Sequence, residues 1–184
     1  MQKSAILKLA LFFLSALTLS ACATPAWLPF GSSSVGQAIT LGEPVTVHFF
    51  TKDPAFDTGV SLQSGLSYQL HINQLSYWID STIERNEAGV KLDEQGFDNS
   101  LRRSPWEGLL RRSRSHNWFE LMLMQPNCKS GSLQGVSDLT LDEASGSYNF
   151  VATCDGNLTL FVNDSHGFYS NNVGYASIVL TRVN

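Results

Sequence analysis

The sequence predicts an all-β fold, an antiparallel β-sandwich of the jelly-roll type. Apolar and polar residues alternate with a period of two in several short runs, as they do in strands with one buried face. Beyond the N-terminal segment, no stretch keeps an apolar stripe at the helical period for three turns. Many short strands separated by turn residues are typical of a sandwich. The runs cover residues 45–49, 66–72, 119–123, 148–152, 158–162 and 178–182.

Turn-forming residues stand between these runs. Gln63-Ser64-Gly65 precedes the run at 66–72, and Asp155-Gly156 lies between the runs at 148–152 and 158–162. Asp-Gly is favoured in the tight type I′ turns of β-hairpins, so we expect a hairpin at that place. Residues 85–118 break the alternation, and we expect a long irregular excursion over that range.

The N-terminal residues 1–21 have the pattern of a secretory signal peptide. Lys3 and Lys8 supply its positive charge, and the uncharged run at 9–19 is shorter than the roughly 20 residues of a membrane-spanning helix. The run ends in Leu19-Ser20-Ala21-Cys22, which is similar to the lipobox of bacterial lipoproteins. We therefore expect cleavage before Cys22 and lipidation of its thiol, by palmitate among other chains. An uncleaved anchor helix is the alternative.

Residues 22–44 are small and turn-rich, which predicts a lipidated tether between the membrane and a single domain at 45–184. By similarity to sorted lipoproteins, Ala23 in place of an aspartate favours the outer membrane. The protein is then expected in the cell envelope, facing the periplasm or the cell surface. Without Lys3 and Lys8 the chain has ten Lys and Arg against sixteen Asp and Glu, a formal charge of −6, which argues against a nucleic-acid partner.

The cysteine count also bears on the compartment. Three cysteines in an exported chain leave one without a partner. If Cys22 is acylated, Cys128 and Cys154 remain, and an oxidising periplasm favours a disulfide between them. Closing that loop is expected to stabilise the fold by roughly 3 kcal/mol in the chain-entropy model. Two buried free thiols are the alternative.

The loop after the run at 158–162 concentrates oxygen-bearing side chains. Asp164 follows the run, and the adjacent Asn171 and Asn172 precede the next one. Calcium takes about six to eight oxygen ligands from carboxylates, amides and carbonyls, and a curved loop of this composition supplies part of such a shell. The alternative is a hairpin loop in which the same side chains cap backbone N–H groups through Asx-type hydrogen bonds.

Residues 163–174 resemble the C-terminal end of the galactophilic bacterial lectin family (PA-I-like), whose pattern is aromatic-Asn-Asp-x-x-Gly-x-Tyr-x-Asn-Asn-x-Gly. The resemblance implies a β-sandwich of the galactose-binding-domain type with a calcium site. Residues 77–81 match a Trp-containing strand that precedes a further carbonyl ligand in the family. Carried over to this chain, the ligands are the Asp164 carboxylate, the Phe168 carbonyl, the Asn171 and Asn172 amides and the Ser81 carbonyl.

The same lectins contact sugar through a His-Pro-x-Gln-Gly loop, and this chain has Ser104-Pro105-Trp106-Glu107-Gly108 in that place. The resemblance implies a sugar contact here, but because the His and Gln positions are changed it does not imply galactose specificity. Trp106 can stack on the apolar face of a sugar, and Glu107 can accept hydrogen bonds from its hydroxyls. His166 lies inside the Asp164 loop and is a further candidate contact.

Half of the basic residues outside the signal lie within thirteen positions of the irregular excursion. Arginine matches the geometry of phosphate and carboxylate groups, so this cluster can meet lipid phosphates, an anionic glycan or an acidic protein partner. The alternative is a solvated loop whose arginines pair with Glu84, Glu87, Asp93 or Glu94. The cluster consists of Arg102, Arg103, Arg111, Arg112 and Arg114.

Two common hydrolase signatures, Gly-x-Ser-x-Gly and His-Glu-x-x-His, are absent from the sequence. We therefore expect a non-enzymatic, membrane-anchored extracytoplasmic binding module that binds carbohydrate with the help of calcium. The alternative is an immunity or inhibitor lipoprotein that captures a toxic effector protein, such as a periplasmic phospholipase. The segment at 102–118 is then the contact, because Trp and Arg dominate interface hot spots.

Overall fold

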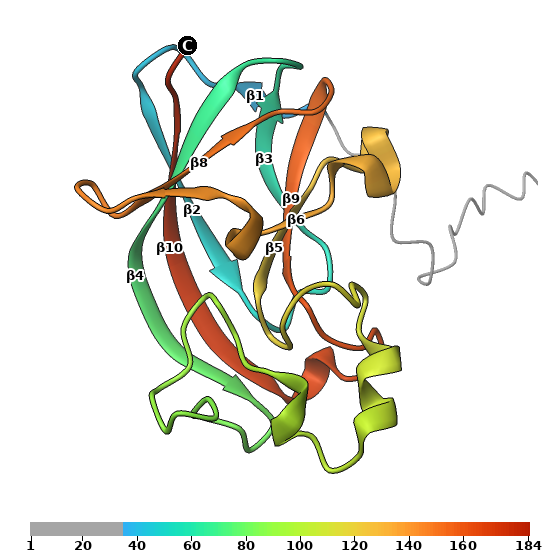
Figure 1. Ribbon diagram of the computed structural model, residues 1–184. Coiled ribbons are helices and arrows are strands. Elements are labelled where there is room, and N and C mark those ends of the chain that lie inside the picture. The colour runs from blue at the N-terminus through green and yellow to red at the C-terminus, as the bar shows by residue number, and fades with distance from the viewer. Residues whose placement is uncertain (1–34) are drawn as a thin grey trace, which may run out of the picture. The chain divides into compact units, whose positions relative to one another are not determined.

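The computed structural model describes residues 35–184, which form two five-stranded β-sheets packed face to face (Figure 1). The predicted signal peptide, the lipidation of Cys22 and most of the predicted tether lie outside the described residues. Between residues 35 and 184, no helix has the length and apolar character needed to cross a membrane.

The first sheet has the strand order β1-β3-β9-β5-β6 and the second has the order β2-β10-β4-β8-β7. Neighbouring strands run antiparallel except β1 and β3, so the predicted antiparallel sandwich is confirmed. The first sheet contains β1 (Gln37–Ala38), β3 (Phe56–Leu62), β9 (Gly156–Val162), β5 (Leu121–Met124) and β6 (Gln134–Gly135). The second contains β2 (Pro44–Phe50), β10 (Asn172–Arg182), β4 (Ser67–Asp80), β8 (Ser147–Val151) and β7 (Thr140–Asp142).

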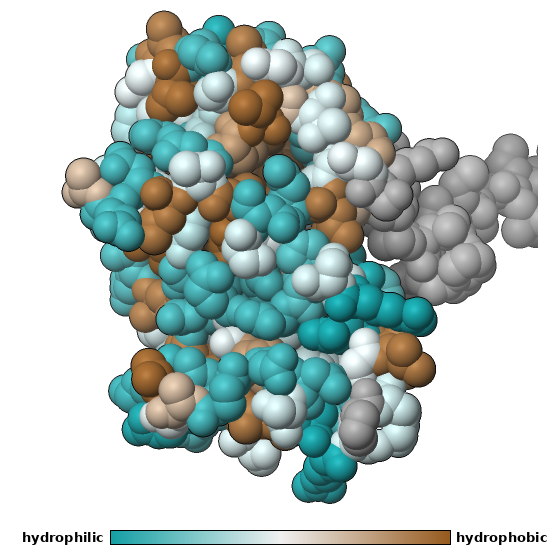
Figure 2. Space-filling model, in the orientation of Figure 1, coloured by the Kyte–Doolittle hydropathy of each residue, from teal (hydrophilic) through white to brown (hydrophobic). Residues whose placement is uncertain are grey.

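The core joins apolar side chains of both sheets. Phe49 of β2 packs against Phe56 of β3, with ring centroids 5.8 Å apart, and Trp78 of β4 packs edge-on against Phe119 at 5.7 Å. Burying a large apolar side chain stabilises a fold by about 1.5–3 kcal/mol. Every residue of β5 is buried, and the 3-10 helix η3 (Pro126–Ser132) contacts both β5 and β9. On the face shown in Figure 2, apolar side chains are scattered among hydrophilic ones, as on a solvated surface.

Both turn segments identified in the sequence cross between the sheets. The expected hairpin at Asp155-Gly156 is wrong, because β8 pairs with β4 in the second sheet while β9 pairs with β3 and β5 in the first. Gln63-Ser64-Gly65 likewise leads from β3 in one sheet to β4 in the other. The turn residues therefore mark where the chain changes direction, whereas strand partners distant in sequence decide which sheet it enters.

Four strands lie outside the runs of alternation, namely β1, β3, β6 and β7. The sequence of β3 does not alternate cleanly. It contains Gly59 at φ +70°, and its pairing with β9 is irregular between Asp57 and Ser61. β1 is only two residues long, yet it pairs with β3, and Ile39 beside it is buried in the core. The chain thus contributes to the sandwich upstream of Val45, where the first alternating run begins.

Cys128 of η3 and Cys154 form a disulfide, as predicted. The bond ties η3 to the crossing between β8 and β9. Gln125 holds the same crossing, because its side-chain oxygen accepts a hydrogen bond from the Thr153 N–H at 3.0 Å.

The segment at 85–118 is irregular, as predicted, and lies at the end of the sandwich where β4 ends and β10 begins (Figure 1). It contains the 3-10 helices η1 (Asn99–Leu101) and η2 (Pro105–Leu110). A third one, η5 (Tyr169–Asn171), immediately precedes β10. These loops and helices surround the predicted site.

Buried side chains fix the excursion to the core. Phe97 is buried and exchanges two backbone hydrogen bonds with Trp118, at 2.8 and 2.9 Å. The adjacent Gly96 has φ +69° and lies so close to the backbone of residues 118–120 that a Cβ atom would overlap it. Glycine is therefore required at this close approach.

Candidate functional site

Three buried polar side chains meet at this end of the sandwich. Asp164 follows β9, Asn172 opens β10 and Asp80 closes β4, and Asn172 and Asp80 are direct partners in the β4–β10 register. Their exposed fractions are 2 %, 0 % and 1 %. Burying polar groups is costly unless they are paired, so the partners of these three side chains decide what the site can do.

Two oxygen atoms of this group have no hydrogen-bond partner. One carboxylate oxygen of Asp164 accepts a hydrogen bond from the Ser165 N–H at 2.7 Å, and the other, Oδ2, has none. The Asn172 amide nitrogen donates to the Thr51 carbonyl at 3.3 Å, while its Oδ1 atom has no partner. A buried oxygen left unpaired costs about 1–3 kcal/mol, and in a native protein it calls for an explanation such as an ion or water.

Asp80 is the residue of this group that sequence reasoning missed. Burial, together with the charge of Asp164, raises the pKa of Asp80 to about 6, although an ion pair with Arg102 opposes the shift. Burial likewise raises the pKa of Asp164. Two buried carboxylates in one site attract a cation, and β4 supplies one of them. Its position at the end of the Trp-containing strand, next to Ser81, was the available signal.

The three remaining predicted ligands are exposed at the surface. Ser81 follows β4 and is exposed, with the positive φ of +57°. Phe168 and Asn171 flank η5 and are also exposed, and the Phe168 carbonyl accepts the Asn171 N–H at 3.1 Å. Among residues 35–184 no three His, Cys, Asp or Glu side chains form a metal-ligand cluster.

The donor set therefore consists of carboxylate, amide and carbonyl oxygens. Such a mixture suits calcium, which accepts all three kinds of oxygen. The unpartnered Asp164 Oδ2 and Asn172 Oδ1 fit this demand, because a cation bound there would satisfy both.

Three arginines of the predicted cluster are engaged inside the protein. Arg102 pairs with Asp80, and its guanidinium stacks 3.8 Å from the ring centroid of Trp118. Arg111 donates to the His116 carbonyl at 2.6 Å and to the Arg114 carbonyl at 3.2 Å. Within residues 35–184, no ion pair joins the cluster to Glu84, Glu87, Asp93 or Glu94.

Arg112 joins the excursion to the Asp164 loop. It donates to the Pro54 carbonyl and, at 3.0 Å, to the Tyr169 hydroxyl, and it stacks 3.5 Å from the ring centroid of Phe161. The Tyr169 hydroxyl in turn donates to the Val162 carbonyl at 2.5 Å, and burial raises the pKa of Tyr169 to about 12. Arg103 and Arg114 are the exposed members of the cluster.

The surface beside the site carries the predicted sugar contacts. Trp106 on η2 is 61 % exposed, and Glu107 next to it is half-buried. His166 is exposed on the Asp164 loop, and partial burial together with the Arg112 charge lowers its pKa. The sequence neighbours of Ser81 and Arg102 take part in a surface pocket. It is lined by Thr82, Ile83, Glu84, Arg85 and Leu101.

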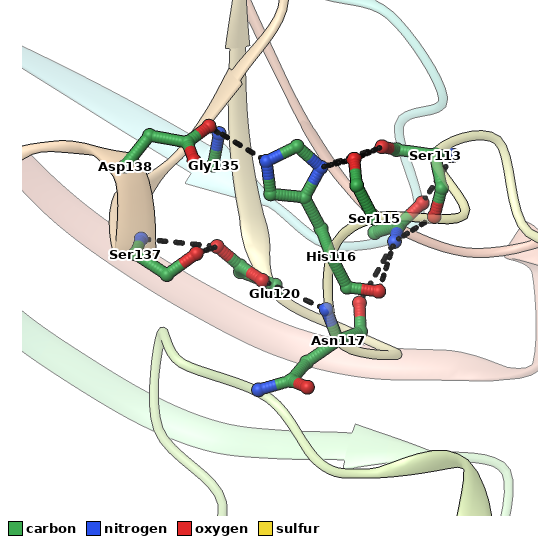
Figure 3. A network of polar contacts seen from close by, with 9 residues as sticks. Ser113, Ser115, His116, Asn117, Glu120, Gly135, Ser137 and Asp138 are labelled. Atoms are coloured by element: carbon green, nitrogen blue, oxygen red, sulfur yellow. Dashed lines mark hydrogen bonds and ion pairs between the residues drawn. The ribbon is translucent and has the colours of Figure 1, made fainter.

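A buried polar network, which sequence reasoning also missed, holds the end of the excursion (Figure 3). The His116 ring lies between the Ser113 hydroxyl, at 2.5 Å from Nδ1, and the Asp138 carboxylate, at 2.6 Å from Nε2. Burial tends to raise the pKa of Asp138, but the hydrogen bonds from His116 and Gly135 outweigh this and hold the pKa below its usual range. Glu120 accepts the Asn117 N–H at 2.9 Å.

Asn163 connects this network to the site. Its side-chain oxygen accepts the Ser113 N–H at 2.9 Å, and its amide nitrogen donates to the carbonyls of Ser113 and Asn117 at 2.9 and 2.8 Å. Because Asn163 immediately precedes Asp164, these bonds fix the backbone from which the Asp164 carboxylate projects. The Asn-Asp pair in the sequence was the signal for this role.

No known protein-family model matches the chain, and no curated protein matches it. Among solved structures, the chain is similar to one described as the EclA N-terminal domain, a PllA-like lectin, with 19 % sequence identity and a TM-score of 0.45. That similarity covers 74 % of this chain and 94 % of the other.

Proposed function

We propose that this protein is a non-enzymatic binding module that recognises carbohydrate through a calcium ion held at the Asp164 loop. The observation that carries the proposal is the pair of buried, unpartnered oxygens, Asp164 Oδ2 and Asn172 Oδ1, at one end of the sandwich. The resemblance of residues 163–174 to the galactophilic lectins points to the same loop.

The Asp164 carboxylate and the Asn172 amide would hold the ion from inside the protein, with Asn171 and the carbonyls of Phe168 and Ser81 on the solvent side. When bound, calcium would orient a sugar by accepting two of its hydroxyls as ligands. Trp106 presents an exposed indole for stacking against the apolar face of the ring. Glu107 and His166 would add hydrogen bonds and so select among sugars.

The proposal includes attachment to the envelope through Cys22. A lipidated module would bind glycans close to the outer membrane, on either of its sides. Mass spectrometry of the mature protein tests this step, because cleavage before Cys22 and acylation of its thiol change the mass of the N-terminal peptide. An N-terminus upstream of Cys22 or a free thiol would contradict the anchoring.

Calorimetric titration of the purified protein with calcium, and then with a panel of monosaccharides, tests the binding function. We expect metal-dependent heat and sugar binding in wild type and neither in Asp164→Asn. Glu143→Gln, which neutralises an exposed carboxylate away from the site, is the matched control and should bind like wild type. Sugar binding that persists in excess chelator, or no heat with any of the proteins, would refute the proposal.

A second function, capture of a toxic effector protein, is favoured by a different observation. Trp106, Leu109 and Leu110 of η2 are exposed, and the exposed Arg103 and Arg114 lie on either side of η2 in sequence. Aromatic and arginine side chains of this kind are typical of interface hot spots. Binding of a protein partner that survives chelation and is lost in Arg103→Ala with Arg114→Ala would support it. Arg111 and Arg112 are unsuitable for this test because they hold the loop together.

A further inference from the structure

Arg102 faces the candidate metal site from within the protein. It directly follows η1, so it belongs to the same excursion as η2 and Trp106. Only 15 % of its side chain is exposed, and its guanidinium is stacked on Trp118 and lies 5.1 Å from the ring centroid of Phe97. In the absence of metal, the Trp118 and Phe97 rings thus position the guanidinium beside Asp80.

The polar contacts of the Arg102 side chain satisfy only part of its guanidinium. One guanidinium nitrogen pairs with the Asp80 carboxylate, and the Arg102 charge also acts on Asp164. The Nε atom is buried and has no hydrogen-bond partner, just as Asp164 Oδ2 has none. Buried donors and acceptors are rarely left unpaired, so this arrangement satisfies only part of the site.

Asp80 and Asp164 need a positive charge beside them, but Arg102 and a calcium ion together would repel each other. Asp80 and Asp164 are almost completely buried, and the pair would be strongly unfavourable in their ionised forms without a positive charge beside them. Arg102 supplies one such charge. A calcium ion carries two positive charges. In the same low-dielectric space these would repel the positively charged guanidinium.

We propose that Arg102 is the built-in counter-cation of Asp80 and Asp164 and that it competes with calcium for them. This inference rests on the proposed function, since it concerns the same site. On calcium binding the guanidinium gives up Asp80 and leaves the carboxylates to the metal. Because Arg102 lies between η1 and η2, its release changes the segment that carries Trp106. Metal loading is thereby coupled to the presentation of the proposed sugar contact.

The test compares calcium affinity in wild type, Arg102→Met and Arg102→Lys by calorimetry. Arg102→Met removes the charge and keeps an apolar chain against Trp118, so we expect calcium to bind at least tenfold more tightly than in wild type. Arg102→Lys keeps the charge and should remain within a few-fold of wild type. Lys91→Met, a change at an exposed basic residue that belongs to neither proposed site, is the matched control and should leave the affinity unchanged. Circular dichroism checks that each variant is folded.

Tryptophan fluorescence gives a second measurement that does not depend on affinity. In wild type, calcium should change the emission of Trp118 as the guanidinium leaves its ring, and this change should be absent in Arg102→Met and in Trp118→Phe. It should persist in Trp106→Phe.

The possible outcomes separate this inference from the proposed function. Equal or weaker calcium binding by Arg102→Met overturns the competition, while the proposed function stands if wild type still binds. Calcium binding by Arg102→Met alone supports the competition and contradicts a calcium-dependent wild type. No binding by any of the proteins overturns both.

Discussion

At the scale of single residues, the site combines two carboxyl groups whose pKa is raised by burial. Asp80 is the last residue of β4 and Asp164 follows β9, and neither is exposed by more than 2 %. In the sequence, Asp164 is marked by the Asn-Asp and Asn-Asn pairs around it. Asp80 is indicated only by its place at the end of the Trp-containing strand, and it is the β4–β10 register that places it beside Asn172.

The raised pKa of Asp80 predicts how stability depends on pH in the absence of metal. The folded protein holds the Asp80 proton up to about pH 6, whereas the unfolded chain releases it near pH 4. This contribution to the free energy of unfolding is therefore fully present below about pH 4 and is lost as the pH rises through 6, by about 3 kcal/mol in total.

Denaturant unfolding of wild type and Asp80→Asn between pH 4 and pH 8, in chelator, measures this effect. Other groups titrate in both proteins, so the difference between the two free energies is the informative quantity. We expect it to change steeply between pH 4 and 6 and to level off above 7. A difference that is constant over the whole range would show that Asp80 titrates as in the unfolded chain.

Loss of the Asn163 side chain should destabilise the backbone that positions Asp164. Its amide makes hydrogen bonds to four backbone groups of the Ser113–Asn117 turn and is completely buried. Asn163→Ala leaves these groups unpaired, and we expect the free energy of unfolding to fall by about 3 kcal/mol. Asn73→Ala, a change at an exposed position, should have an effect below about 0.5 kcal/mol. Similar values for the two variants in chemical denaturation would be evidence against this role.

At the scale of elements, local pattern predicted six of the ten strands and failed at the connection between β8 and β9. The alternation at 45–49, 158–162 and 178–182 corresponds to β2, β9 and β10, whose inward side chains build the core. The turn at Asp155-Gly156 has hairpin chemistry but joins two sheets, because β9 finds its partners in β3 and β5. Such pairings join residues distant in sequence, and no local pattern specifies them.

The excursion shows the same division between local and distant information. Its irregularity is visible in the sequence, yet the internal engagement of Arg102, Arg111 and Arg112 is not. A run of arginines with few acidic neighbours indicates a basic surface. Arg102 pairs with Asp80, and Arg112 contacts Pro54, Phe161 and Tyr169, which are all outside the excursion. Arg111 donates to carbonyls within the excursion itself. Only the structure therefore separates these three from Arg103 and Arg114.

The disulfide between Cys128 and Cys154 should matter most at the crossing between the sheets. It closes a loop with a sequence separation of 26 residues, so the chain-entropy model gives it a stabilising effect of about 3 kcal/mol. Replacing both cysteines by serine should lower the melting temperature and leave calcium affinity unchanged, since the bond lies outside the Asp164 loop. Scanning calorimetry with and without reductant checks this, and an unchanged melting temperature on reduction would contradict it.

At the scale of the whole molecule, the sandwich brings the ends of β4, β9 and β10 together and places the irregular segment over them. The fold class could be predicted from the periodicity of apolar residues alone. In the candidate site, the sequence singled out Asp164 and Asn172, which the structure buries close to one another. Their role as metal ligands stays a prediction. Asp80, Arg102 and the His116 network belong to the tertiary arrangement and could not.

A crystal structure of the protein grown with calcium tests the central claim most directly. We predict a cation bonded to Asp164 Oδ2 and Asn172 Oδ1 at about 2.3–2.6 Å, with the Arg102 guanidinium moved away from Asp80. A calcium-soaked crystal in which Arg102 still pairs with Asp80, and in which water or nothing lies beside those two oxygens, would contradict the account.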